Sequence, residues 1–322
     1  MSEGHIVPGS IYIYAPNKIA PVFFSVAFAL ACGAHVCQAH SYKSWKLTAL
    51  YPFSCLLFSL GFVLREYGAF NYYDTTANLN IYIASTCLIY MAPPLLELAN
   101  FHVLGRILYF VPYCAPMHPG RVLTTFAMLS SLIEVLNAIG VTYLANKSLP
   151  ENLINLGQVL MKVGLCLQIL AIALFVLCAV VFHRRCARAG LTTNRKVSTP
   201  LIIMYISTAL ILARTVYRIV EYFSIANLEA TPTVTAISPI LRYEWFFYVF
   251  EASIMCANVC MWSIYHPRRY LPADPHVFLE RDGITETEGP GWEDDANYWM
   301  TLIDPFGCTR KHKGQGDSLQ EK

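Results

Sequence analysis

The sequence predicts an all-α integral membrane protein, a bundle of seven transmembrane helices. Of the 322 residues, 56% are hydrophobic and only 14% are charged, and the mean hydropathy is +0.44. An ordinary soluble domain carries about 25% charged residues. Seven apolar runs approach the ~20 residues that a helix needs to cross a bilayer. They cover residues 19–38, 48–64, 80–103, 122–144, 156–182, 200–223 and 241–265.

The distribution of Lys and Arg predicts the orientation of this bundle. The segments after the first, third, fifth and seventh runs hold twelve of these residues close to the membrane, whereas the alternate set offers only Lys18 and Lys147. Basic segments stay on the cytoplasmic side. We therefore expect residues 1–18 outside and a cytoplasmic tail at 266–322, whose polar composition favours disorder. The glycosylation sequon at Asn146 then falls outside.

Several classes of protein are disfavoured by the residues present. The net charge of +2 comes without a basic stripe, so we expect no nucleic-acid partner. The cysteines form no CxxC or Cys/His spacing that would indicate a zinc site. A retinal protein needs a lysine in its last span, and 241–265 has none. A membrane zinc hydrolase needs ligands at one depth, but His35, His102 and His183 lie at the ends of runs. We therefore expect no enzyme and no cofactor. No ATP-binding motif is present either, so transport would be facilitative, proton-linked or flippase-like without ATP.

The last two runs carry the charges around which the bundle is expected to be organised. Arg214, Arg218 and Glu221 stand at i, i+4 and i+7 and share one helical face. Glu244 and Glu251 share a face by the same spacing. A charge that faces lipid costs roughly 2.5–3.5 kcal/mol, so these side chains must face protein or water. Antiparallel packing at ~1.5 Å per residue places Arg214 level with Glu251. Arg218 and Glu221 then come level with Glu244.

Charged residues and prolines in and near the second and third runs are expected to have roles in their immediate surroundings. Arg65 is expected at the outer interface, where it snorkels or pairs locally. Arg106 is expected to anchor at lipid head groups. Pro93 and Pro94 lie in the middle of the third run, where they free backbone carbonyls and bend the helix. This bend beside Glu97 would make a cavity wall.

The order of these motifs resembles the fungal RTA-like family, the lipid-translocating exporters named for aminocholesterol resistance. The most specific part reads Arg214-x-x-Tyr217-Arg218-x-x-Glu221, then Glu244-Trp245-Phe246-Phe247-Tyr248-x-Phe250-Glu251, then His266-Pro267. Further matches, assigned structural roles, are Gly61, Arg65, Pro93, Arg106, Gly157, Gly164, Gln168 and His266. The family usually has a Glu where this chain has Phe58, and a Gln where it has Asn137. We assign the acidic position of the fourth run to Glu134.

The resemblance implies a multi-pass protein of the plasma membrane or an endomembrane that moves or exports an amphipathic compound. Such a compound would be a sphingoid base, a sterol-like or a porphyrin-like molecule, and the protein would serve lipid homeostasis or resistance to amphipathic toxins. Its expected partners are membrane lipids and this small-molecule substrate. A seven-helix receptor or sensor of lipid-like ligands has the same topology and stays as the alternative.

Two interpretations of the buried charges also stay open. In the first, Arg214 pairs with Glu251 and Arg218 pairs with Glu244 or Glu221. These pairs only fix which helices touch, because an unpaired buried charge is worse than a paired one. In the second, the charges line a hydrated pocket for a polar head group, and aromatic side chains hold the apolar body of the ligand. The residues predicted for this pocket are Glu134, Lys162, Arg214, Tyr217, Arg218, Glu221, Glu244, Trp245, Tyr248 and Glu251.

Overall fold

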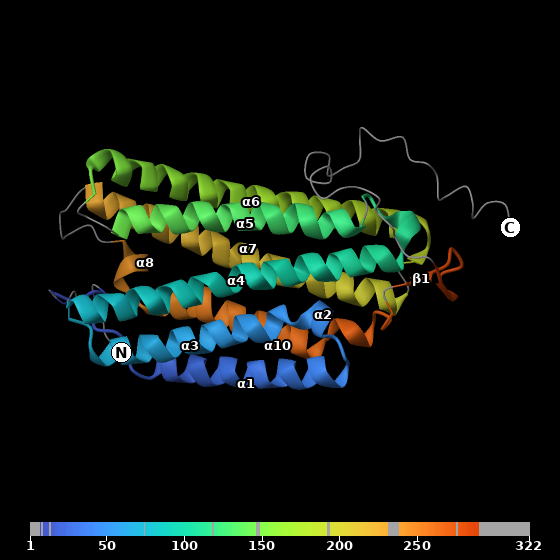
Figure 1. The fold of residues 1–322 in the computed structure, drawn as a ribbon, viewed down its shortest axis with the longest axis horizontal. Coiled ribbons are helices and arrows are strands. Elements are labelled where there is room, and N and C mark those ends of the chain that lie inside the picture. The colour runs from blue at the N-terminus through green and yellow to red at the C-terminus, as the bar shows by residue number, and fades with distance from the viewer. Residues whose placement is uncertain are drawn as a thin grey trace.

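The computed structural model describes residues 7, 9–12, 14–73, 75–117, 119–145, 149–191, 194–230, 238–274 and 276–289. Within these ranges, seven helices are long and apolar enough to cross a membrane. They lie side by side along one direction and form a single bundle (Figure 1). The sequon at Asn146 and the tail from residue 290 onward lie outside the described residues.

Six of the seven spans are single helices, and the seventh is composite. The single helices are α1 (Ala20–Ser41), α3 (Leu50–Phe70), α4 (Thr76–Phe110), α5 (Pro119–Ala145), α6 (Glu151–Arg188) and α7 (Arg195–Ala230). The seventh span joins α9 (Trp245–Phe247), the π-helical turn η4 (Tyr248–Ser253) and α10 (Ile254–Ile264). The short connecting helices are α2 (Trp45–Thr48), η1 (Pro112–Cys114), α8 (Pro239–Arg242) and η5 (Pro267–Arg269).

The bundle has two distinct ends. The segment of residues 9–17 and α8 lie at one end, which we call the N-terminal end. The antiparallel hairpin of β1 (Val277–Leu279) and β2 (Glu286–Glu288) lies at the other, which we call the hairpin end (Figure 1). α4 runs without interruption through Pro93 and Pro94 and connects both ends.

Close helix contacts depend on two of the motif glycines. A Cβ at Gly61 would lie 2.6 Å from Ile89 Cγ1, so glycine allows α3 to pack closely on α4. Ser85 uses this approach to donate a hydrogen bond of 2.8 Å to the Gly61 carbonyl. A Cβ at Gly164 would overlap Asn137 Oδ1, so α5 and α6 meet at this position. The small residues at these interfaces therefore serve helix packing.

An aromatic core joins α1 to α3. Phe58 is fully buried, and its ring stacks on Phe28 with 4.4 Å between the ring centroids. Phe62 continues the stack and also lies 5.5 Å from Phe24. Phe58, at the position where the resemblance implied a carboxylate, is thus part of this apolar packing, which a charge in the same place would disrupt.

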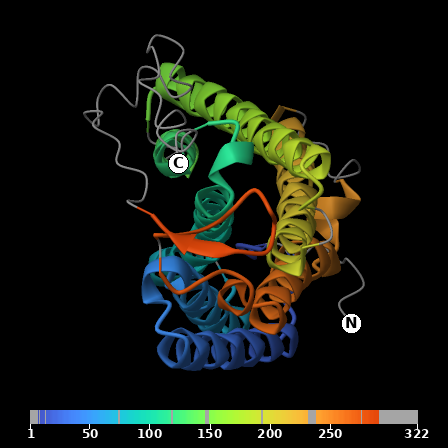
Figure 2. The same ribbon diagram turned by 90° about the vertical axis from the view of Figure 1, so that its right-hand side faces the viewer.

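Up to residue 289 the tail differs from the expectation of disorder, because it contains the hairpin. Leu271 and Leu279 are buried against the bundle. Tyr113 donates a hydrogen bond of 2.9 Å to the Glu280 carbonyl, and Asn194 donates one of 3.0 Å to the Gly283 carbonyl. Viewed from this end, the hairpin lies across the ring of helices (Figure 2). The hairpin contacts the bundle through two leucines and a few backbone acceptors. So few residues do not stand out in a polar stretch of sequence.

Arg106 also differs from its predicted role. Its guanidinium group donates to the carbonyls of Pro272 and Asp274, which lie just before the hairpin. Arg106 therefore ties the end of α4 to the following chain. We had expected it to reach for lipid head groups, because nothing in the sequence indicated that the tail would return to the bundle.

Candidate functional site

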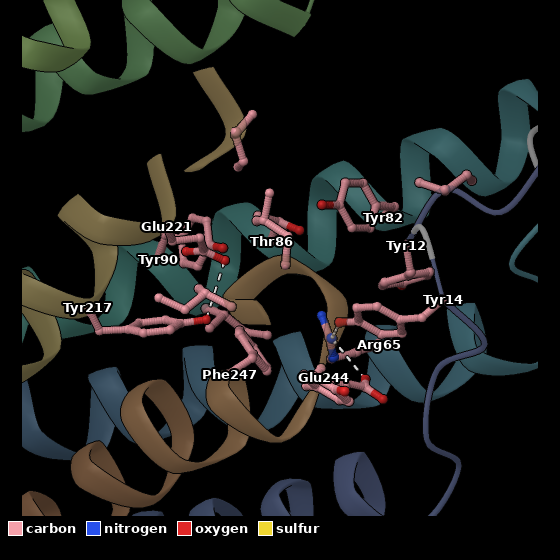
Figure 3. A pocket seen from close by; sticks show the side chains of 16 residues that line it. Tyr12, Tyr14, Arg65, Tyr82, Thr86, Tyr90, Tyr217, Glu221, Glu244 and Phe247 are labelled. Carbon is pink, nitrogen blue, oxygen red and sulfur yellow. Dashed lines mark hydrogen bonds and ion pairs between the residues drawn. The ribbon is translucent and has the colours of Figure 1, made fainter. Parts of the chain in front are cut away.

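A cavity of about 190 Å³ opens at the N-terminal end of the bundle. Its walls come from the N-terminal segment, α3, α4, α7, α8 and the start of the seventh span (Figure 3). The polar lining consists of Tyr12, Tyr14, Arg65, Tyr82, Thr86, Tyr90, Tyr217, Glu221, Tyr243 and Glu244. The apolar lining consists of Ile11, Ile89, Ile225, Ile240, Leu241 and Phe247.

The first ion pair of the cavity joins Arg65 to Glu244. Arg65 Nη2 lies 3.0 Å from Glu244 Oε1, and the two side chains are only 7% and 5% exposed. Tyr248 donates to the same oxygen at 3.0 Å, and the Asn17 backbone N–H donates to Oε2 at 2.7 Å. The guanidinium carbon lies 4.1 Å from the centre of the Phe247 ring. Glu244 is therefore a junction between the N-terminal segment, α3 and the seventh span.

This pair corrects the expectation for Arg65 and bears on the partner of Arg218. Arg65 does not snorkel at the interface, because it is buried and bonded across the bundle. Glu244 and Glu221 were both open as partners of Arg218, and the structure pairs Arg218 with Glu221. Helical rise predicts depth along a helix, but it does not say which of several arginines at that depth is the neighbour.

The second ion pair confirms the predicted partnership of Arg214 with Glu251. Arg214 Nε donates to both carboxylate oxygens of Glu251 at 2.9 Å. The Glu251 side chain is fully buried, and that of Arg214 is 13% exposed. Glu251 belongs to the π-helical turn η4, a local widening that often marks functional positions in helices.

The third pair lies within α7, one turn from the second. Arg218 bonds to Glu221 on the same helix face and to the hydroxyl of Tyr90 on α4. Its guanidinium carbon lies 3.7 Å from the centre of the Tyr90 ring, which adds a cation–π contact. Tyr217 donates to Glu221 Oε1 at 3.4 Å, as the dashed line in Figure 3 shows.

A second group of acidic side chains lies deeper in the bundle. Glu97 on α4 is 4% exposed and accepts a hydrogen bond from Gln168 on α6. Glu134 on α5 interacts electrostatically with Glu97 and with Arg214. Neither carboxylate is among the residues that line the cavity. Gln168, predicted as a structural motif residue, thus contacts a carboxylate in the interior.

Of the ten predicted pocket residues, only Tyr217, Glu221 and Glu244 line the cavity. The ion pairs and hydrogen bonds described above include Arg214, Arg218, Tyr248 and Glu251, but these four do not line it.

Two further predicted residues are exposed. The Lys162 side chain is exposed on α6, and Trp245 is 51% exposed at the start of the seventh span. Neither lines the cavity. Lys162 avoids the bundle interior because the packed face of α6 holds Gly157 and Gly164, which stand five residues before and two after it. His266 accepts a hydrogen bond of 3.2 Å from the Arg268 N–H and caps η5.

The sequence analysis predicted only one of the six cavity tyrosines, Tyr217, and missed the other five. Tyr82, Thr86 and Tyr90 follow each other at intervals of four, so α4 presents them on one face, a pattern that was readable in advance. Tyr12 and Tyr14 come from a segment without periodicity. Tyr12 fits there because Gly68 has no side chain, and a Cβ at that position would overlap the tyrosine hydroxyl.

Seven apolar helices around a charged, tyrosine-lined cavity define a multi-pass membrane protein with a polar chamber at one end. The chain belongs to the RTA1-like protein family, whose model matches residues 52–274. No solved structure matches the chain.

The curated relatives carry names of transport proteins. A lipid-translocating exporter-like protein RTA1 of Leptosphaeria maculans is 46% identical over 292 residues, which are 88% of this chain and 56% of that protein. This chain therefore spans little more than half of that relative. A protein of the same name from Ajellomyces capsulatus is 28% identical, covering 82% of both chains. Protoporphyrin uptake protein 1 of Saccharomyces cerevisiae is 26% identical, covering 79% of this chain and 91% of that protein.

Proposed function

We propose that this protein moves an amphipathic lipid-like compound across its membrane and binds the polar head group of that compound in the cavity at the N-terminal end. The observation that carries the proposal is a cavity lined by two carboxylates, a guanidinium group and six tyrosines within an apolar bundle. The names of the relatives support the class of substrate. As the basic segments lie at the hairpin end, we place that end in the cytoplasm.

The size of the cavity favours a head group over a whole lipid. Sites that enclose a drug-sized ligand measure about 300–1,000 Å³, whereas this one measures about 190 Å³. The hydrocarbon part of the substrate would lie along the apolar side of the cavity, where Ile225 of α7 meets Ile240 and Leu241 of α8. Carboxylates and tyrosine rings together suit an amine, which gains hydrogen bonds and cation–π contacts.

The test is leaflet exchange in liposomes that contain the purified protein. A fluorescently labelled long-chain base is added to one leaflet, and its arrival in the other is followed by quenching from outside. Wild-type protein should accelerate the exchange over empty liposomes. Binding of the base without acceleration would contradict transport and favour a sensor.

A pair of tryptophan substitutions ties the exchange to the cavity. Thr86 lines the cavity, so Thr86→Trp should fill it and abolish the acceleration. Ile83 lies on the same helix and is 39% exposed on its outer face, so Ile83→Trp is the matched control and should retain it. Equal loss in both variants would indicate that α4 tolerates no tryptophan, and equal retention would exclude the cavity as the route.

A further inference from the structure

Glu97 is a buried carboxyl group that the cavity does not use. It lies on α4 shortly after Pro93 and Pro94, and only 4% of its surface is exposed. Gln168 donates a hydrogen bond to its Oε2. Among the described residues, its Oε1 has no hydrogen-bond partner. Within the same part of the chain, Glu97 has no ion pair with a basic side chain, so its only bonded neighbour is neutral.

The carboxylates at the cavity and beside it differ from Glu97, because each of them has a cationic partner. Glu221, Glu244 and Glu251 each form an ion pair with an arginine. An ionised carboxylate in the interior without a bonded cation is costly, and a carboxyl group escapes that cost by binding a proton. At Glu97, a bound proton can therefore neutralise the carboxylate in place of an arginine.

Charged groups reach Glu97 from two other helices. Glu134 of α5 and Arg214 of α7 both interact with its carboxyl group electrostatically, while α6 contributes the neutral Gln168. Arg214 also attracts Glu134 and is bonded to Glu251. The charge on Glu97 therefore acts directly on the cation of the Arg214–Glu251 pair.

The same pair connects Glu97 to the cavity. Glu251 interacts electrostatically with Arg218 and with Tyr90. Arg218 donates a hydrogen bond to the Tyr90 hydroxyl, and Tyr90 lines the cavity. A continuous series of interactions therefore leads from the cavity wall to Glu97.

These groups contain more acids than bases. The carboxyl groups are Glu97, Glu134, Glu221, Glu244 and Glu251, and the guanidinium groups are Arg65, Arg214 and Arg218. If every carboxyl group were ionised, the interior would carry excess negative charge. Either protons or a bound cation can neutralise this excess, so binding of a cation and binding of protons compete with each other.

The backbone near these groups can rearrange. Pro93 and Pro94 remove two donors from the hydrogen-bond ladder of α4 one turn before Glu97. Glu251 lies in the π-helical turn of the seventh span. Such irregular turns are common sites of bending in helices. A change of charge at Glu97, which acts on Arg214, therefore occurs beside irregular turns in two helices.

We propose that Glu97 is a proton-binding site that couples movement of a cationic head group to movement of a proton in the opposite direction. The inference rests on the proposed function. When the cationic head group enters the cavity, the O–H bond of the Glu97 carboxyl group breaks, and the proton leaves to water on the side of entry. After the head group leaves on the other side, the carboxylate takes a proton from that side. Charge in the interior stays constant throughout.

The first experiment measures protons directly. Purified wild-type protein in lightly buffered detergent is mixed with a long-chain base, and a pH-indicator dye reports proton release. Ceramide, the uncharged N-acylated analogue, is the control ligand. We expect release with the base and none with ceramide. Binding of the base without any release would overturn the coupling, whereas failure of the base to bind would instead overturn the proposed function.

A substitution then tests whether the released proton comes from Glu97. Glu97→Gln keeps the shape of the side chain and should bind the base with complete loss of proton release. Glu151→Gln, on the exposed first turn of α6, is the matched control and should release protons as the wild type does. Unchanged release from Glu97→Gln would overturn the assignment.

A second variant covers the case in which Glu97→Gln fails to fold. Gln168→Leu removes the hydrogen bond to the ionised carboxylate and leaves the carboxyl group in place. The pH dependence of proton release should shift upward in this variant, and an unshifted dependence would contradict the role of Glu97. In liposomes, wild-type exchange should respond to a pH gradient, while Glu97→Gln should exchange the base at the same rate with or without it.

Discussion

The two halves of the bundle bury polar groups by different means. The N-terminal half holds arginine–carboxylate pairs and tyrosines around a cavity. In the half toward the hairpin, Ser207 accepts hydrogen bonds of 2.9 Å from Asn100 and 3.0 Å from Trp262, all of them neutral groups. Neutral hydrogen bonds hold helices together without attracting an ion. The difference supports the proposed head-group site in the N-terminal half, where the buried polar groups are charged.

The largest expected effect concerns the pair at the boundary between these halves. Arg214→Leu or Glu251→Leu alone strands a buried charge and should destabilise the protein by about 3–5 kcal/mol. The double leucine variant should recover most of this stability, because a buried pair is often replaceable by apolar side chains. Folded protein is measured by fluorescence-detected size-exclusion chromatography after heating in detergent.

The activity of the double variant then separates scaffold from pocket. Recovered stability with recovered exchange would mean that the pair only joins helices. We expect recovered stability without exchange, because Arg214 connects the cavity to Glu97. A double variant as unstable as the worse single one would contradict the pairing of the two residues.

A smaller effect is expected in the neutral half. Ser207→Ala leaves the Asn100 amide and the Trp262 N–H without their common partner, which should cost about 1–3 kcal/mol. Leaflet exchange per folded molecule should not change. A selective loss of exchange at normal stability would show that the hairpin half also contacts the substrate, and would weaken the contrast between the halves.

A still smaller effect is expected at the hairpin itself. Lys196 and Glu286 form an ion pair of 2.7 Å whose side chains are 54% and 30% exposed. Such exposed pairs contribute about 0–1 kcal/mol. Glu286→Gln should therefore leave the melting temperature of the bundle almost unchanged. A large drop would show that the hairpin stabilises the bundle far more than its exposed contacts indicate.

The hairpin loop should also respond weakly to acid. Hydrogen bonds from the Thr285 hydroxyl and from the backbone N–H groups of Ile284 and Thr285 hold the pKa of Asp282 below its usual range. Because the pKa of Asp282 is lowered, its ionised carboxylate stabilises the loop at any pH above the ordinary pKa of an aspartate. This contribution is lost as the pH falls through the lowered pKa. After correction for the intrinsic pH dependence of exchange, the protection of the amides of residues 280–289 should therefore fall at low pH, and Asp282→Asn should remove this loss of protection. Amide protection that does not change with pH in the wild type would contradict this prediction.

Parts of this architecture were predictable because they follow from local spacing. Long apolar runs predict spans, and helical rise correctly placed Arg214 opposite Glu251. The partner of Arg65 was not predictable, since depth does not say which helices are neighbours in a bundle. Tyr12 depends on a non-periodic segment that reaches the space beside Gly68. Nothing in single-sequence periodicity reports such a contact.

The hairpin and Glu97 illustrate two further limits. Strands of three residues carry too little alternation to be recognised in a polar tail. Glu97 was placed beside a proline bend, but its isolation from basic partners is visible only when the neighbouring helices are in place. Charge pairing within a bundle is a property of three or four helices at once, while a sequence pattern describes one.

A second hollow supplies the competing location for a substrate. It measures about 400 Å³ and lies between α4 and α5, where Leu98, His102, Leu123 and Met128 line it. It is more apolar than the cavity at the N-terminal end, with no carboxylate or guanidinium group in its lining.

The most direct measurement is photo-crosslinking with a long-chain base that carries a photoreactive group beside its amine, followed by mass spectrometry of the labelled peptides. We expect labels on the cavity tyrosines, chiefly Tyr82, Tyr90 and Tyr217, and their loss when unlabelled base competes. Thr86→Trp should prevent this labelling and Ile83→Trp should not. Competable labelling confined to the hollow around His102, with the cavity tyrosines unlabelled, would contradict the account.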